Sequence, residues 1–313
     1  MTGLQARPRT ARARREAIGP GTTGRSLMAC GRARAYVGAV MRTIRQLSMP
    51  ERLAALAGVS AAAASLLGFV PGLYRDRAVV VAQSHGYDTG NLVVVLVLGV
   101  ALAWSARGSL RGRLVAAGAL ACLLYSYVTY AFLIVINPAT VLYIAVLGMG
   151  GWALATGLAR VDAEAVEAAV EGRLARRTTG VVLVVLALLF AALWLSQIAQ
   201  SAVSGKLPAG LADAGWPMNP VYVLDLGFVV PLLLLTGSRL LRRRPGAARL
   251  AVPLLTFVPL LAASILAMAI GQAIVGQAVQ VPMVAAFVLV LAWLALGSPA
   301  RPATRLRGRA PAS

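Results

Sequence analysis

The chain is poor in the residues on which most metal and nucleophile chemistry depends. Its 313 residues include two cysteines, ten acidic residues and a single histidine, His85. One histidine cannot ligate haem in pairs, and the common zinc sites would lack ligands. Cys30 lies in a basic tail and Cys122 in an apolar run, so we predict no disulfide between them. We therefore expect no metal and no cofactor.

Charge is also scarce. Charged residues make up 13% of the chain and apolar residues 59%, with a mean hydropathy of +0.78. Soluble domains usually carry about 25% charged residues. This composition excludes an ordinary soluble enzyme, a disordered chain and a disulfide scaffold. It predicts an all-α fold, a polytopic transmembrane helical bundle.

Apolar runs long enough to cross a bilayer recur along the chain. A spanning helix needs about 20 mostly apolar residues. We predict eight spans, with seven as the alternative: Leu53–Leu73, Asn91–Ala106, Leu114–Ile136, Ala139–Ala159, Thr179–Ser201, Pro220–Leu241, Leu250–Ile270 and Val281–Leu296. The stretch Gly271–Gln280 is itself apolar enough to form a re-entrant turn.

The basic residues indicate how these spans are oriented. With eight spans and a cytoplasmic N-terminus, 27 of the 30 basic residues fall on the cytoplasmic side. Arg75, Arg77 and Lys206 fall outside. This asymmetry fits the positive-inside rule, so we expect both termini in the cytoplasm.

Two basic tails flank the predicted transmembrane domain, residues 49–298. We expect residues 1–48 and 299–313 to be disordered, because they lack sustained apolar periodicity. Translation could instead begin at Met41 or Met49, or the tails could contact anionic lipid. Because the basic residues punctuate apolar runs, we expect the lipid bilayer and no nucleic acid as a partner; the sequence identifies no protein partner.

The segment Val161–Arg177 has the pattern of a surface helix. Acidic residues come early and arginines late, which complements a helix dipole. Val166, Val170 and Leu174 recur at spacing four. The pattern predicts a short amphipathic helix along the inner membrane surface, with a plain connector as the alternative.

One acidic residue, Asp225, lies inside a predicted span, whereas His85 and Asp88 fall in a predicted outer loop. Asn219 and Pro220 are suited to the start of that span, which places Asp225 about 7–8 Å along the helix. Other polar side chains gather toward the same half of the membrane. We predict an outward-facing polar site that binds a ligand, with a structural hydrogen-bond cluster as the alternative. Its candidate residues are Asp225, Tyr222, Tyr130, Tyr143, Gln197 and Tyr127.

Two runs of the sequence share a form. Asn137-Pro138 precedes the fourth span as Asn219-Pro220 precedes the sixth, and this alignment matches Tyr143 with Asp225. The match could be the trace of an internal repeat. The alternative is that Asn-Pro is simply suitable for starting a helix.

These runs carry a resemblance. The segment Tyr125–Phe132, the Asn137-Pro138 pair and the run Asn-Pro-Val-Tyr-Val-Leu-Asp-Leu-Gly-Phe at 219–228 are similar to those of a family of uncharacterised bacterial integral membrane proteins. The likeness covers roughly residues 49–298. It implies a multi-pass protein of the bacterial cell (inner) membrane and no particular activity, substrate or cofactor.

Three classes of function are compatible with the sequence. The first is a sensor or accessory protein that binds a small ligand or a partner from outside. The second is a transporter of a small molecule or a cation. An enzyme acting on a lipid-linked substrate is favoured least, because a catalytic residue set is missing. An aspartyl intramembrane protease needs two acids in the membrane, and only Asp225 lies within a predicted span.

Overall fold

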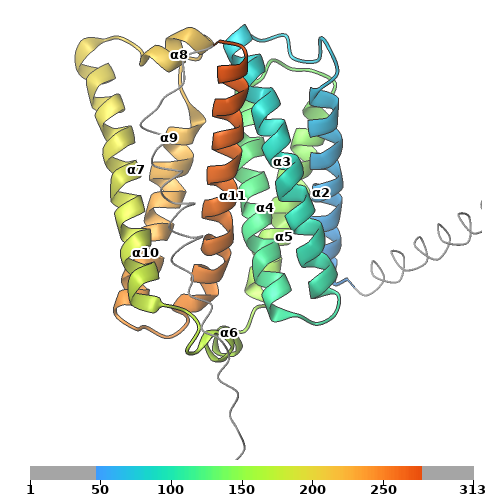
Figure 1. Ribbon diagram of the computed structural model, residues 1–313, viewed down its shortest axis with the longest axis vertical. Coiled ribbons are helices and arrows are strands. Elements are labelled where there is room, and N and C mark those ends of the chain that lie inside the picture. The colour runs from blue at the N-terminus through green and yellow to red at the C-terminus, as the bar shows by residue number, and fades with distance from the viewer. Residues whose placement is uncertain (1–46, 277–313) are drawn as a thin grey trace, which may run out of the picture. The chain divides into compact units, whose positions relative to one another are not determined.

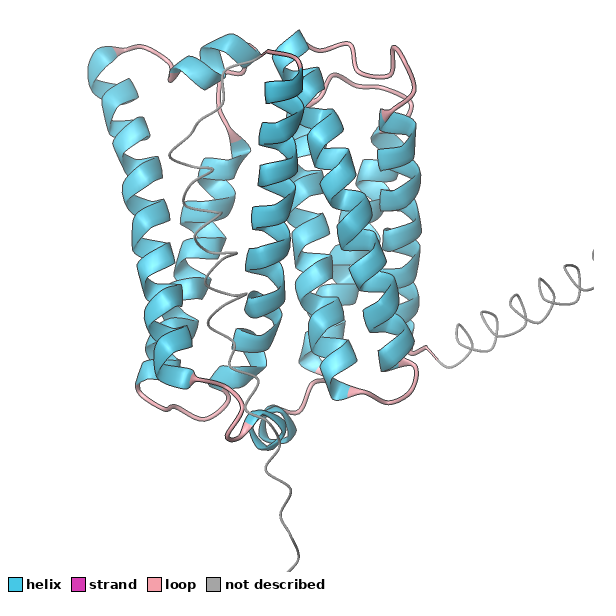
Figure 2. Cartoon of the chain, viewed as in Figure 1, coloured by secondary structure: helices cyan, strands magenta, loops and turns pink. Residues whose placement is uncertain are grey.

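The computed structural model describes residues 47–276, which contain helices and loops but no strand (Figure 2). Seven stretches of helix are long and apolar enough to cross a membrane. They are α2 (Met49–Gly68), α3 (Ala78–Ser105), α4 (Leu110–Leu133), α5 (Thr140–Ala159), α7 (Arg176–Ser204), the continuous α9–η1–α10 (Pro220–Leu241) and α11 (Ala247–Ile274). These helices support a multi-pass membrane protein.

The seven helices match seven of the eight predicted spans. The eighth, Val281–Leu296, and both predicted tails except Leu47 and Ser48 lie outside the described residues. Large apolar side chains such as Leu96, Phe132 and Val141 point away from the bundle, each at least 70% exposed. Such a surface is stable against lipid tails and costly against water.

The second span differs most from its prediction. α3 begins at Ala78 and not at Asn91, so His85 and Asp88 are helical and not in a loop. Polar residues lower the hydropathy of this first half of the helix, which is why its sequence indicated a loop. Packing of α3 against α2, α4 and α11 buries Asp88, while His85 stays exposed and stacks on Phe69 with ring centroids 5.9 Å apart.

Glycines allow several of these helices to approach closely. Gly86 and Gly90 of α3 face α11, and a Cβ atom at Gly86 would lie 2.4 Å from the carbonyl oxygen of Ala267. At the contact of α7 with α10, a Cβ atom at Gly180 would lie 2.9 Å from the carbonyl oxygen of Gly237. Small residues at such spacings are typical of packed membrane helices, which lack a hydrophobic driving force between them.

The two ends of the bundle carry different short helices, α6 (Ala163–Val170) at one and α8 (Ala209–Ala214) at the other (Figure 1). The loops α3–α4, α5–α7 and α10–α11 lie at the α6 end. The loops α2–α3, α4–α5 and α7–α9 lie at the α8 end.

The structure corrects the surface helix that was predicted over Val161–Arg177. Only Ala163–Val170 forms α6, and α7 already begins at Arg176. Val166 is fully buried in a cluster with Leu114 and Ala248, so the apolar stripe packs on the bundle.

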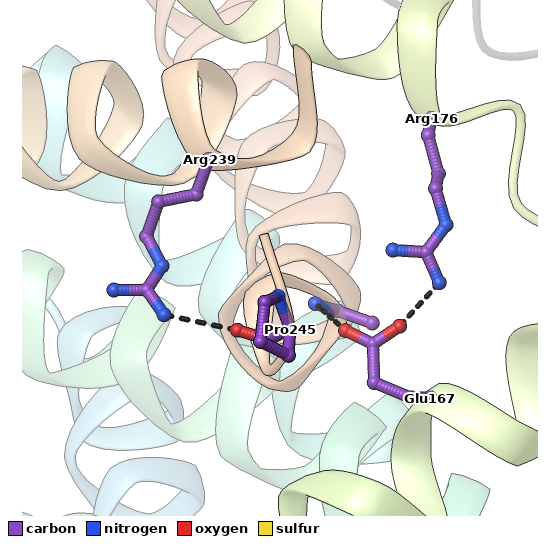
Figure 3. Close-up of polar contacts among 5 residues, drawn as sticks. Glu167, Arg176, Arg239 and Pro245 are labelled. Carbon is purple, nitrogen blue, oxygen red and sulfur yellow. Dashed lines mark hydrogen bonds and ion pairs between the residues drawn. The ribbon is translucent and has the colours of Figure 1, made fainter. Parts of the chain in front are cut away.

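Polar contacts also tie α6 to its neighbours. Glu167 of α6 accepts hydrogen bonds from Arg176 and from the backbone N–H of Ala248 (Figure 3). Beside them, Arg239 donates to the carbonyl oxygen of Pro245 in the α10–α11 loop. Burial by itself raises the pKa of Glu167, but the bonds from Arg176 and Ala248 outweigh burial and hold this pKa below its usual value.

Candidate functional site

The sixth span starts regularly and then changes its winding. The side chain of Asn219 accepts a hydrogen bond from the N–H of Val221 at 3.0 Å, and Pro220 takes the first helical position, as the sequence predicts. After five residues the helix opens into a π-helical segment, η1 (Asp225–Val229). Pro231 follows at the start of α10 and has no N–H for the regular bonding pattern. Single π-helical turns are frequent at functional sites.

Asp225 opens this π-helical segment and is buried, with only 5% of its surface exposed. The hydroxyl of Tyr125 donates to Oδ1 at 3.0 Å, and Nε1 of Trp194 donates to Oδ2 at 2.6 Å. The donors come from α4 and α7. Both are neutral, so they stabilise the carboxylate without adding a balancing charge.

A second hydrogen bond lies beside this group. The hydroxyl of Tyr222 donates to Oε1 of Gln197 at 2.8 Å, and the rings of Tyr222 and Trp194 are 5.3 Å apart. The structure thus places Asp225, Tyr222 and Gln197 of the predicted site in one region. The sequence-based prediction did not name Tyr125 or Trp194. The available signals were the mid-depth position of Tyr125 and the placement of Trp194 one turn before Gln197.

These side chains line a cavity of about 360 Å³ in the α8 half of the bundle. Its polar wall includes Asp225 and Gln197, and its apolar wall includes Phe257, Leu261 and Ile265. The cavity is within the size range of small-molecule sites, which combine mostly apolar walls with a few placed polar groups.

The helix α8 lies over one end of this cavity and contributes Leu211 to its wall. Arg77 fixes α8 in place, since its Nη1 donates to the carbonyl oxygens of Ala212 at 2.9 Å and Asp213 at 3.1 Å. Gly215 ends α8 with φ +74°, and a Cβ atom there would lie 2.8 Å from Cζ of Arg77. Glycine adopts this positive φ without strain, and its missing side chain leaves room for the guanidinium of Arg77.

Asp88 forms a second buried group with tyrosines of its own. The hydroxyl of Tyr74 donates to its Oδ2 at 2.7 Å, and the hydroxyl of Tyr130 lies 3.0 Å from its Oδ1. The rings of Tyr127 and Tyr143 pack on Tyr130, each with a centroid separation of 5.4 Å. Burial, and then the neighbouring carboxylate, raise the pKa of Tyr74, which keeps this loop phenol a donor.

The structure therefore divides the predicted site in two. Asp225, Tyr222 and Gln197 line the cavity, whereas Tyr127 and Tyr143 belong to the Asp88 group and are not among the lining residues. Tyr130 lines the cavity wall and reaches Asp88 with its hydroxyl. Tyrosines on one helix point to different neighbours, since Tyr125 donates to Asp225 and Tyr127 donates to the carbonyl oxygen of Ala61.

The prediction that Asp225 is the one acidic residue inside a span was wrong, because Asp88 also lies inside a span. An aspartic protease needs two carboxyl groups close enough to share a proton. Here both oxygens of each carboxyl group contact aromatic hydroxyl or indole groups, and no hydrogen bond between Asp88 and Asp225 is found in the described part of the chain. The arrangement does not resemble a catalytic pair.

The two Asn-Pro runs have similar local geometry. The side chain of Asn137 accepts from the N–H of Ala139 at 2.9 Å, just as Asn219 accepts from Val221. The aligned residues Tyr143 and Asp225 nevertheless belong to different groups, so an internal repeat stays a hypothesis.

Residues 47–276 contain no group of three or more His, Cys, Asp or Glu side chains that could hold a metal ion. Comparison with family models, with curated proteins and with solved structures finds no match for the chain. The resemblance to a membrane protein family stays a prediction, and the function has to be argued from the site itself.

Proposed function

We propose that this protein binds a small molecule in the cavity beside Asp225, as a sensor or accessory protein of the membrane. The observation that carries the proposal is the cavity of about 360 Å³, whose wall contains a buried carboxylate held by two side-chain donors. Holding an acid at membrane depth is costly, and such residues usually mark a functional site.

The proposed ligand enters from outside the cell, at the α8 end. In the described residues the loops and helix ends at the α6 end carry thirteen arginines, from Arg52 to Arg249, whereas the α8 end carries Arg75, Arg77 and Lys206. The positive-inside rule then assigns the α6 end to the cytoplasm. Eight spans, cytoplasmic termini and the inner bacterial membrane complete the proposed topology.

Binding without transport is supported by where the cavity lies. Its walls come from the α8 half of the bundle, with Leu233 and Phe257 among the residues farthest from α8 along their helices. A transporter would need a route to the α6 end as well.

A transporter is the second candidate, because two helices that line the cavity are irregular. The π-helical segment beside Asp225 interrupts the sixth span, and Pro253 and Pro259 lie inside α11. Breaks of this kind are where membrane helices bend, and a bend could open the cavity to the other side.

Native mass spectrometry of the full chain, extracted gently from its membrane, tests the proposed binding. Ala269 lines the cavity, so Ala269→Trp fills it. The neighbouring Ile270 is 52% exposed on the outer surface, and Ile270→Trp is the matched control. We expect a small molecule on the wild type and on the control but not on Ala269→Trp. Equal retention by all three proteins, or a bare mass for the wild type, would contradict the proposal.

A further inference from the structure

We propose that the ligand of this cavity is an organic cation, an ammonium group on an apolar body. The inference rests on the proposed binding function and adds the chemical class of the ligand. Its first support is the distribution of charge. The chain has 30 basic residues and ten acidic ones, yet the described lining residues include no lysine, arginine or histidine. They do include two acids, Asp213 and Asp225.

The second support is that Asp225 has no positively charged hydrogen-bond partner in the described residues. Its oxygens are hydrogen-bonded to Tyr125 and Trp194, which are neutral. The salt bridge found within residues 47–276 joins Glu167 and Arg176, at the α6 end. A buried carboxylate is costly without a positive partner, and a bound cation supplies one.

The third support is the set of aromatic rings around this carboxylate. Trp194 and Tyr222 are tilted against each other, and Tyr125 meets Phe257 edge to face with ring centroids 6.0 Å apart. All four rings line the cavity. Aromatic faces attract ammonium groups, and more strongly where water is excluded.

The remaining walls indicate an organic ligand and not a metal ion. Leu261, Ile265 and Met268 give the cavity an apolar side suited to a hydrocarbon body. A hard metal cation would need about six oxygen ligands. Residues 47–276 offer no group of three or more His, Cys, Asp or Glu side chains for such an ion, and the carboxylate of Asp225 already accepts two hydrogen bonds.

Three probes test the inference, 4-phenylbutylamine, 4-phenylbutanol and 4-phenylbutanoate, which share a phenyl ring on a four-carbon chain and carry a positive, a neutral and a negative head group. Each is titrated calorimetrically into the full chain in phosphatidylcholine nanodiscs, with empty nanodiscs subtracted. We expect the amine to bind about tenfold more tightly than the alcohol, because a charge-assisted hydrogen bond exceeds a neutral one by about 1.4 kcal/mol. The carboxylate should bind most weakly.

Two variants assign the preference to its residue. Asp225→Asn removes the charge in the cavity and should bring amine and alcohol within about threefold of each other, since the charge-assisted gain is lost. Asp88→Asn removes the other membrane acid, which is outside the cavity lining, and should keep the amine preference.

The ranking of the three probes on the wild type decides the inference even if a variant fails to fold. A wild type that prefers the alcohol or the carboxylate, or binds none of the probes, overturns it. So does an amine preference that survives in Asp225→Asn. In each of these cases, retention of a small molecule that depends on Ala269 would still support the proposed binding function, and the two proposals are thereby separated.

Discussion

The hydrogen bond between Trp194 and Asp225 allows a quantitative test of the buried charge. Trp194→Phe keeps an aromatic ring against Tyr222 but removes the N–H that lies 2.6 Å from Oδ2. Asp225→Leu removes the acceptor at similar volume. The coupling energy from the two single variants and the double variant isolates the interaction.

The magnitude depends on whether the acceptor is charged. Hydrogen bonds to charged groups contribute about 1.5–3 kcal/mol to stability. Side-chain hydrogen bonds between membrane helices average about 0.6 kcal/mol. Because this bond is short, buried and directed at a carboxylate, we expect a coupling energy of about 1.5 kcal/mol or more.

Reversible unfolding of the four proteins in detergent micelles, followed by circular dichroism, measures this coupling. The neutral pair Tyr222 and Gln197 lies in the same region, and the cycle of Tyr222→Phe with Gln197→Leu is its matched control. We expect about 0.6 kcal/mol there. Equal coupling energies for the two pairs would refute the inference that Asp225 is a charged acceptor.

Three further predictions concern other parts of the molecule. Gly86→Ala should destabilise the protein by about 1–3 kcal/mol in the same unfolding assay, because the new Cβ atom would collide with α11; an unchanged stability would contradict this close packing. Arg77→Gln should speed amide hydrogen exchange in α8, since it removes the guanidinium that holds two of its carbonyl oxygens, and an unchanged exchange rate would show that other contacts fix α8. Stability should fall as the pH drops below about 4.5, because the folded-state pKa of Glu167 is lowered. Its contribution is complete above the ordinary pKa and is lost as the pH falls through the folded-state value. Glu167→Gln should flatten that fall in a pH series of melting curves, and an unchanged fall would contradict the assignment.

Much of the helical architecture follows from the sequence alone. A run of about 20 apolar residues forms a spanning helix because every backbone polar group must be satisfied within lipid, whatever the rest of the chain does. The sixth span matches its predicted bounds because Asn219 and Pro220 start a helix by local chemistry. Asp225 could be singled out for the same reason, as an acid within an apolar run.

The first half of α3 shows where local patterns fail. Its sequence is polar enough to resemble a loop. It is helical and buried because Asp88 accepts hydrogen bonds from Tyr74 and Tyr130, which lie on other parts of the chain. These partners are separated from Asp88 by 14 and 42 residues, so a window as long as one spanning helix cannot contain both.

The sequence by itself determined that this is a helical membrane protein with an acid, Asp225, inside one of its apolar runs, because lipid requires every spanning segment to be helical and mostly apolar. Only the tertiary structure decided which side chains surround each acid, because that depends on the rotation of each helix about its axis. Packing rotated Tyr125 and Trp194 toward Asp225, and Tyr127 toward Ala61 and Ser65. The cavity between these helices is a product of that packing.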